Sequence, residues 1–376
     1  MAEEAREPAD DDAPGGTGED EQDEATPPHP PWDPQSIRIS TKAFALRQVV
    51  DDLREGTIDL APDFQRPSVW TPQKQSLLIE SVLLGIPLPI FYFNADRDRR
   101  LQVMDGVQRL TAFRRFTDDE LALQGLEYLP QLNGKTWKGL EASHRRAFHH
   151  TQIIVHVIDA TTPADVKTNI FKRINTGGTP LSPQEIRHAM TQVRSREMLA
   201  RMTRTEAFRR VVPEKDQGES RMFERELALR FVAFTVDPTL DAYDKASTFD
   251  AFLLSAARQL DQPDVVPDAR VKTLELAFET SMVAAWEIFG PYAFRITLPE
   301  TTRRNRLNRA LFDSWSVALS EHPLVALRAR REAIACAARE AFARDAAYLE
   351  SVRQGTNVKD RILKRFEVAR AILRGA

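Results

Sequence analysis

The sequence predicts an α+β domain followed by an all-α domain, and three patterns support this division. Four short strand-like runs occur early in the chain and are separated by helical runs, at 58–60, 88–93, 101–104 and 152–159. Beyond residue 189 the apolar residues follow helical spacing only. An acidic, proline-rich segment precedes both parts. We therefore expect a disordered tail at 1–35, an α+β domain at 36–195 and an α-helical domain at 196–376.

The first 35 residues differ in composition from the rest of the chain. They contain twelve Asp or Glu against one Arg, and seven prolines. Their formal charge is thus −11, and because the whole chain carries −3, the remainder carries about +8. Such a polar segment buries too little apolar surface to offset the entropy lost on folding. Two roles are open for this tail, namely shielding a basic nucleic-acid surface and adding solubility without any specific contact.

Composition also bounds the class of protein. The 376 residues are 42% hydrophobic and 28% charged, which is enough for two domains with sizeable cores. The sequence has no apolar run near 18 residues and no signal-like N-terminus, so we expect a cytoplasmic protein without a membrane partner. Cys336, as the single cysteine, excludes an internal disulfide and a multi-cysteine zinc site.

The first elements of the α+β domain follow from local patterns. Residues 44–55 have apolar residues at helical spacing up to Gly56, and 58–60 is a short extended piece. Thr71 and Pro72 are an N-cap and N1 pair, which predicts a helix over 73–84. The runs 88–93 and 101–104 flank a polar turn and should form a hairpin.

Three later elements complete the domain. Residues 152–159 alternate as a strand does, with Ile153, Val155 and Val157 on one face. Residues 163–173 should form a helix that carries Phe171. Ser182, with Pro183 at N1 and Glu185 at N3, forms a capping box that predicts a further helix.

The segment Asp105-Gly106-Val107-Gln108-Arg109-Leu110-Thr111 lies between the strand at 101–104 and a helix over 110–116. A helix N-terminus presents N–H groups and a positive dipole end, and this attracts anions. Gly106 allows close approach of a ligand to the backbone, Arg109 offers a fork of donors to phosphate, and Asp105 offers a carboxylate to a metal or a water. The alternative is a plain turn with a surface arginine.

Two further blocks accompany this turn in order. One reads Pro62-Asp63-Phe64-Gln65-Arg66 with Trp70 following, and the other reads Asn175-Thr176-Gly177-Gly178-Thr179-Pro180-Leu181-Ser182 with Glu185 following. Together the three blocks resemble the N-terminal domain family of GmrSD-type restriction systems, a branch of the ParB/sulfiredoxin-like fold, over residues 37–190. The family usually reads P-x-F-Q-R-x-x-x-W, D-G-Q-Q-R-L-T and N-x-x-G-x-x-L-S-x-x-E. Here Val107 replaces the first glutamine of the second block.

This resemblance implies NTP binding and hydrolysis in a prokaryotic restriction or anti-phage defence system. It implies that Arg109 binds phosphates, that Asp105 positions Mg²⁺ or the attacking water, and that Gln108 orients water or ligand. It further implies a set of nucleotide-binding residues: Gln65, Arg66, Gly106, Arg109, Thr111, Asn175, Gly177 and Gly178. Since Val107 removes one amide of the usual pair, hydrolysis is less well supported than binding. The nucleotide base stays unspecified.

Structural explanations compete with these assignments. Asn175, Gly177 and Gly178 tolerate positive φ and would also permit a sharp turn without a ligand. Arg66 would also brace the helix that follows it. At the level of function, one alternative is a non-enzymatic DNA-binding or adaptor protein that senses nucleotide, and another is a metal-dependent DNA nickase.

Residues 190–376 contain neither a His-Asn-His arrangement nor a D-x-n-E-x-K signature, so we expect any nuclease to be a separate partner subunit. The chain also lacks a G-x-x-x-x-G-K-[ST] loop, which leaves the Arg109 turn as the phosphate site.

The all-α domain is basic toward its end, with sixteen Lys or Arg against eight Asp or Glu from Arg303 onward. We expect a helix over 303–319 in which Arg303, Arg306 and Arg309 share one side and contact DNA phosphates. The alternative is a solvated helix face. The other side should be buried, with Leu307, Leu311, Phe312 and Trp315. Further helices are predicted at 197–204, 206–211, 221–236, 248–259, 269–289, 323–344 and 359–372.

Overall fold

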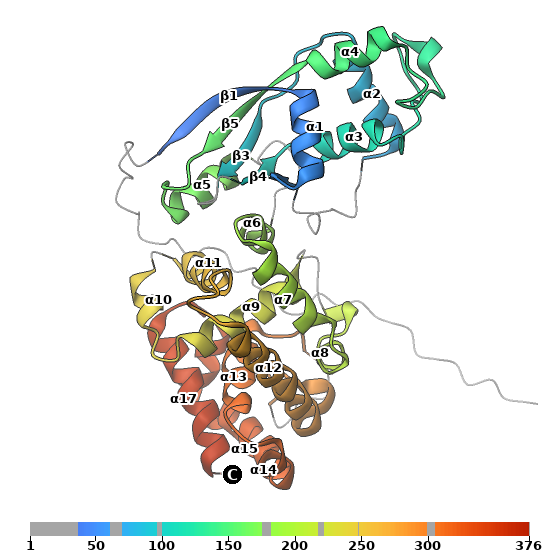
Figure 1. Ribbon diagram of the computed structural model, residues 1–376. Helices are drawn as coiled ribbons and strands as arrows, with labels where there is room; N and C mark the ends of the chain where they lie inside the picture. The colour runs from blue at the N-terminus through green and yellow to red at the C-terminus, as the bar shows by residue number, and fades with distance from the viewer. Residues whose placement is uncertain are drawn as a thin grey trace, which may run out of the picture. The chain divides into compact units, whose positions relative to one another are not determined.

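The computed structural model describes residues 37–60, 70–95, 100–174, 182–216, 222–246, 248–298 and 305–375. Within these ranges, a five-stranded sheet occupies the N-terminal part and the later part is helical (Figure 1). The mixed α/β class followed by a mostly helical region is therefore confirmed. The predicted tail at 1–35 lies outside the described residues.

The sheet has the strand order β1-β5-β3-β4-β2. Edge strand β1 (Ile39–Ala45) pairs antiparallel with β5 (Gln152–Ile158), and β5 pairs parallel with β3 (Phe91–Ala95). β3 forms the expected antiparallel pair with β4 (Leu101–Asp105), and β4 pairs parallel with β2 (Ile58–Asp59). The sequence did not predict β1. Five of its seven residues are exposed, so the strand has no apolar alternation to reveal it.

Four helices bury their apolar side chains against one face of this sheet, namely α1 (Leu46–Glu55), α2 (Pro72–Leu83), α3 (Val107–Thr117) and α4 (Ala142–His150). Their cluster contains the side chains that alternate inward on β5, as predicted: Ile153, Val155 and Val157. On the other face of the sheet, Met104 and Ile158 pack with side chains of α5 (Ala164–Ile174) and α6 (Pro183–Ala189), including the buried Phe171.

The structure contains the capping interactions from which several helix boundaries were predicted. The Thr71 hydroxyl accepts the Lys74 N–H at 3.3 Å and starts α2, with Pro72 at N1. Ser182 and Glu185 form both hydrogen bonds of the capping box that starts α6. Gly56, at φ 75°, ends α1 in the left-handed conformation. Short-range signals therefore located these helix ends correctly.

The helical region packs around its own apolar cluster. Its longer helices are α7 (Val193–Arg204), α8 (Glu206–Val211), α9 (Phe223–Val236), α11 (Phe249–Leu260), α12 (Asp268–Phe289), α13 (Arg309–Ser320), α14 (Leu324–Ala329), α15 (Arg331–Arg344), α16 (Ala346–Arg353) and α17 (Lys359–Gly375). A short α10 (Asp241–Lys245) and α16 were not predicted. α7 continues across residue 195, where the sequence placed the domain boundary, and the division into two domains stays a prediction.

Two helix predictions in this region were wrong. The helix expected over 303–319 begins at Arg309, because the Asn308 side chain accepts the Leu311 N–H at 2.8 Å and caps it there. The helix expected over 323–344 is divided at Arg330, whose φ of −119° and ψ of 13° depart from helical values. The predicted burial of Leu311, Phe312 and Trp315 is confirmed, and Leu307 is partly buried.

Within the described ranges, no helix is both long enough and apolar enough to cross a membrane.

Candidate functional site

Gly106 connects β4 to α3 and is the N-cap of that helix, with φ 101°. A side chain is excluded for two reasons, since this φ is unfavourable for other residues and an added Cβ would lie 2.3 Å from Cδ1 of Phe91. The close approach that requires glycine here is thus made by the Phe91 ring. This accounts for Gly106 without any ligand. The turn still leaves the first N–H groups of α3 without intrahelical partners, as every α-helix start does.

The Arg109 side chain turns back onto this junction. Its guanidinium lies over the Phe91 ring, with Cζ 4.0 Å from the ring centroid, and donates to the backbone carbonyls of Pro89 and Ile90. Nη2 also donates to Asp105 Oδ2 at 2.9 Å. These three acceptors account for three of the five N–H donors of a guanidinium. Arg109 therefore links the start of α3, by hydrogen bonds, to the segment that leads into β3.

The environments of the two charged partners differ. The Arg109 side chain is 11% exposed, and its burial lowers the pKa of the guanidinium even though the Asp105 carboxylate raises it. The Asp105 side chain is 38% exposed, so solvent or a ligand can reach its carboxylate. No group of three or more His, Cys, Asp or Glu suited to a metal occurs among the described residues. Asp105 is the accessible half of the pair.

The residues around this pair link the first and second motif blocks. The Trp70 N–H donates to Oε1 of Gln108 at 3.3 Å, which brings the last residue of the first block to the start of α3. Thr111 lies one helical turn beyond Gln108 and is half-buried. Val107 packs against the apolar cluster of the sheet and α1–α4. The position at which the family carries its first glutamine thus contributes to core packing here.

The third block approaches the second through β4. Gln102 of β4 donates through Nε2 to the Thr191 carbonyl just after α6, at 3.0 Å, and Met104 packs against Ile186 of α6. Helix α6, which the third block starts, therefore lies against β4, the strand that leads into the second block. Several predicted site residues lie outside the described ranges: Gln65, Arg66, Asn175, Gly177, Gly178 and Arg303.

Arg306 and Arg309 occupy different environments from those expected. Arg306 is exposed but precedes α13, so the predicted fan of arginines on one helix face does not form as stated. Arg309 is 27% exposed, its Nε lies 3.7 Å from Oε1 of the buried Glu226, and its guanidinium lies 5.1 Å from the Phe223 ring centroid. Arg309 contacts α9, and DNA contact by these arginines remains a prediction.

Sequence reasoning missed a buried ionic cluster in the helical region. Arg230 of α9 and Arg365 of α17 lie 3.3 and 3.2 Å from Oδ2 of Asp313 in α13. Arg230 also bonds Glu226 at 2.9 Å, and Arg187 of α6 lies 3.5 Å from the same carboxylate. Burial raises the pKa of Glu226, but the three nearby arginines, Arg230 first, outweigh it and lower this pKa to about 2. The carboxylate thus stays charged at neutral pH.

A local signal for this cluster was present in the sequence. α9 is buried around much of its circumference, yet it contains Glu226 and Arg230 at i, i+4 spacing within an otherwise apolar run. Charges at such positions must be paired inside the core. On α6, burial, followed by the charges of Arg196 and Arg225, lowers the pKa of His188 to about 3. His188 is accordingly neutral at pH 7.

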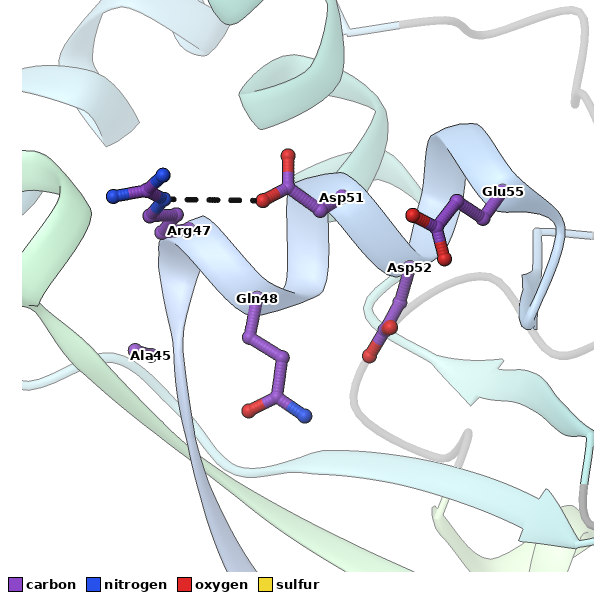
Figure 2. Close-up of a pocket in the computed structure, with 6 residues that line it drawn as sticks. All are labelled: Ala45, Arg47, Gln48, Asp51, Asp52 and Glu55. Atoms are coloured by element: carbon purple, nitrogen blue, oxygen red, sulfur yellow. Dashed lines mark ion pairs between the residues drawn. The ribbon is translucent and has the colours of Figure 1, made fainter.

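A hollow of about 340 Å³ lies elsewhere, along the outside of α1 (Figure 2). It is lined by side chains of that helix and its N-cap: Ala45, Arg47, Gln48, Asp51, Asp52 and Glu55. Burial raises the pKa of Asp52, and Glu55 and Asp51 add to the rise. Figure 2 shows Arg47 paired with Asp51, at 3.9 Å, and the hollow contains none of the predicted site residues. An open acidic surface of one helix does not define a site.

Comparison with known proteins found a family match for one part of the chain. Residues 46–192 match the family model described as GmrSD restriction endonuclease, N-terminal domain. The match confirms the resemblance that the three motif blocks indicated, and it points to a role in a restriction system. It covers less than half of the chain and ends near the start of α7. No curated protein and no solved structure matches the chain.

Proposed function

We propose that this chain, which carries a GmrSD-type N-terminal domain at residues 46–192, is a nucleotide-binding regulatory protein of a prokaryotic restriction or anti-phage defence system. The same resemblance supports assigning the sheet domain to the ParB/sulfiredoxin-like fold. DNA and a separate nuclease subunit are its proposed partners. The observation that carries the proposal is the pairing of Arg109 with a solvent-accessible Asp105 at the N-terminus of α3, within the matched segment.

The geometry suggests how a triphosphate would bind. The N-terminal N–H groups of α3 and the Arg109 guanidinium can share one phosphate group, because both adjoin the Gly106 turn. Arg109 is already oriented by the carbonyls of Pro89 and Ile90, so little side-chain entropy is lost when it binds. A phosphate oxygen would compete with Asp105 for the guanidinium. Phosphate binding would thereby release the Asp105 carboxylate.

Asp105 could contribute one carboxylate ligand to a magnesium ion. Mg²⁺ is commonly held by one or two protein carboxylates, with phosphate oxygens and waters completing its octahedron. Asp105 supplies one accessible carboxylate, and the described residues contain no group of three or more His, Cys, Asp or Glu suited to a metal. When bound, Mg²⁺ would neutralise phosphate charge. In this proposal Asp105 would hold the ion, and Gln108, which accepts the Trp70 N–H, would help to orient ligand or water.

Two observations favour a second candidate, an adaptor that senses nucleotide without turnover. Val107, which is partly buried against the core, replaces the usual glutamine, and the Asp105 carboxylate is paired with Arg109. Both reduce the polar groups available to activate a water. Measuring phosphate release by wild type and Asp105→Asn separates the candidates. Turnover lost in the variant while binding persists supports hydrolysis, and absence of turnover in wild type supports the adaptor.

The test of binding is calorimetry with ATP, GTP, CTP and UTP in the presence of Mg²⁺. Arg109→Ala should weaken binding by about 1.5–3 kcal/mol, the range for a hydrogen bond to a charged group. Arg114→Ala, on the same helix but more than one turn further along, is the matched control and should bind as wild type does. Arg109→Lys keeps the positive charge if the alanine variant unfolds. Unchanged affinity in both Arg109 variants would reject the site.

A further inference from the structure

The second basic region of the molecule is α4 and the turn before it. Between Lys135 and His150 the chain carries four Lys or Arg and three His against a single acid, Glu141. The cations are Lys135, Lys138, Arg145 and Arg146. No binding site was predicted in this stretch from the sequence.

These cations have few internal partners. Among the residues that the structure describes, no carboxylate forms an ion pair with Lys135, Arg145 or Arg146, and Arg146 is exposed. Arg145 donates to the Lys138 carbonyl at 3.3 Å, and the Lys138 side chain is 82% exposed with Asp119 at 3.6 Å. The positive charge of this surface is therefore largely uncompensated.

The basic end of the chain behaves differently. Many of its cations are paired with carboxylates of neighbouring helices, at 2.6 Å for Arg328 with Glu287 and for Arg370 with Glu321, and at 2.8 Å for Lys364 with Asp345. Paired charges offer a weaker field to a polyanion. Part of the positive charge near the C-terminus is therefore neutralised within the protein.

Helix α4 is also held in place by the core beneath it. Phe148 is fully buried and its ring lies 5.8 Å from that of Phe113 and 5.3 Å from that of Trp137. Because Phe148 fixes the inner side of α4, the exposed side carries Arg146 and His150 at i, i+4 spacing. Because the backbone of α4 is fixed, Arg145 and Arg146 would lose side-chain but little backbone entropy on contacting a phosphate chain.

We propose that the α4 surface, defined as Lys135, Lys138, Arg145 and Arg146, binds the phosphate backbone of duplex DNA. Phosphate contacts are sequence-independent, so this surface would position the DNA and not read its bases. On one side of this surface α1 packs against α4 and carries Asp51, whose charge acts on His149. The proposal rests on the DNA-coupled function proposed above and names the surface that makes the contact.

The experiment measures binding of the full chain to a labelled 30-bp duplex between about 50 and 200 mM salt. Arg145→Ala/Arg146→Ala should lower the slope of log K against log salt by about two units, and binding near 0.1 M salt should fall roughly tenfold or more. Duplexes of unrelated sequence should lose affinity alike. The control Arg339→Ala/Arg374→Ala removes the same charge from exposed positions of α15 and α17 and should bind as wild type does.

Three outcomes overturn the proposal. They are equal slopes in wild type and the α4 variant, equal losses in both double variants, and no DNA binding by wild type at about 50 mM salt. If the Arg145→Ala/Arg146→Ala variant is unfolded under these conditions, Lys138→Ala replaces it. That variant should lower the slope of log K against log salt by about one unit. Nucleotide calorimetry on the same variants keeps the two proposals distinct. Failure of the Arg109 test alone removes the nucleotide site and leaves the α4 surface standing.

Discussion

The sheet region and the helical region use charged side chains in opposite ways. In the sheet region, Asp105 and Arg109 lie at the edge of an apolar core, where a helix begins and solvent reaches the carboxylate. In the helical region, Asp313 and Arg365 are fully buried and Arg230 nearly so. The difference teaches that a charged residue signals a ligand site only where the fold leaves part of it accessible.

The buried cluster has a physical reason to resist substitution. Removing ions from water is costly, and the cost is offset only when each charge finds partners of good geometry. Asp313 meets two arginines from different helices, and Glu226 meets three. The cluster therefore joins α6, α9, α13 and α17 through buried ion pairs.

The largest expected effect is the loss of folding stability when Asp313 is removed. Asp313→Ala leaves Arg230 and Arg365 buried without their shared carboxylate and should destabilise the protein by about 3–5 kcal/mol, as measured by urea unfolding. The control Glu287→Ala breaks the exposed pair with Arg328 and should change stability little. A small effect of Asp313→Ala would show that water reaches the cluster, and the contrast between the regions would not hold.

The second effect tests the packing of the α3 turn. Gly106→Ala combines an unfavourable φ with a Cβ placed against Phe91, so about 2–4 kcal/mol of stability should be lost. Gly134→Ala has a similar φ of 80° but no neighbouring atom within 4 Å, and so isolates the backbone cost. If both variants lose the same stability, the Phe91 contact does not constrain the turn.

The smallest effect concerns pH. His188 has a folded pKa of about 3 against 6.5 for the free side chain, so between these values the unfolded state binds more protons. Stability should therefore fall as pH drops below about 6.5, by up to ~1.4 kcal/mol per pH unit. Glu226, with a folded pKa of about 2, contributes stability that is lost only below about pH 4.5.

The measurement compares urea unfolding of wild type and His188→Gln between pH 7 and pH 5. The variant should lose less stability over this range. Comparison of the same proteins at pH 8, where the histidine is neutral in both states, gives the packing cost of the substitution alone. Parallel pH curves for the two proteins would show that His188 is solvated in the folded state.

Much of the sheet region could be predicted because its signals are short-range. The Thr71 and Ser182 caps, the β3–β4 hairpin and the alternation on β5 each depend on residues within a few positions. β1 could not be predicted, because an exposed edge strand has no apolar alternation and is defined by its partner β5, more than 100 residues away. The turn at Gly106 was predicted, yet its contact with Phe91 was not, since that contact joins the start of α3 to β3 and forms only when the chain folds.

The sequence by itself determined the mixed class, the family of residues 46–192 and the location of the Asp105–Arg109 turn. Only the tertiary structure decided how the charges are used. It paired Arg109 with backbone carbonyls and Asp105, buried Asp313 between two arginines and left Arg145 and Arg146 without carboxylate partners among the described residues. The physical reason is that accessibility and pairing depend on neighbours brought together by folding, whereas caps and periodicity depend on neighbours along the chain.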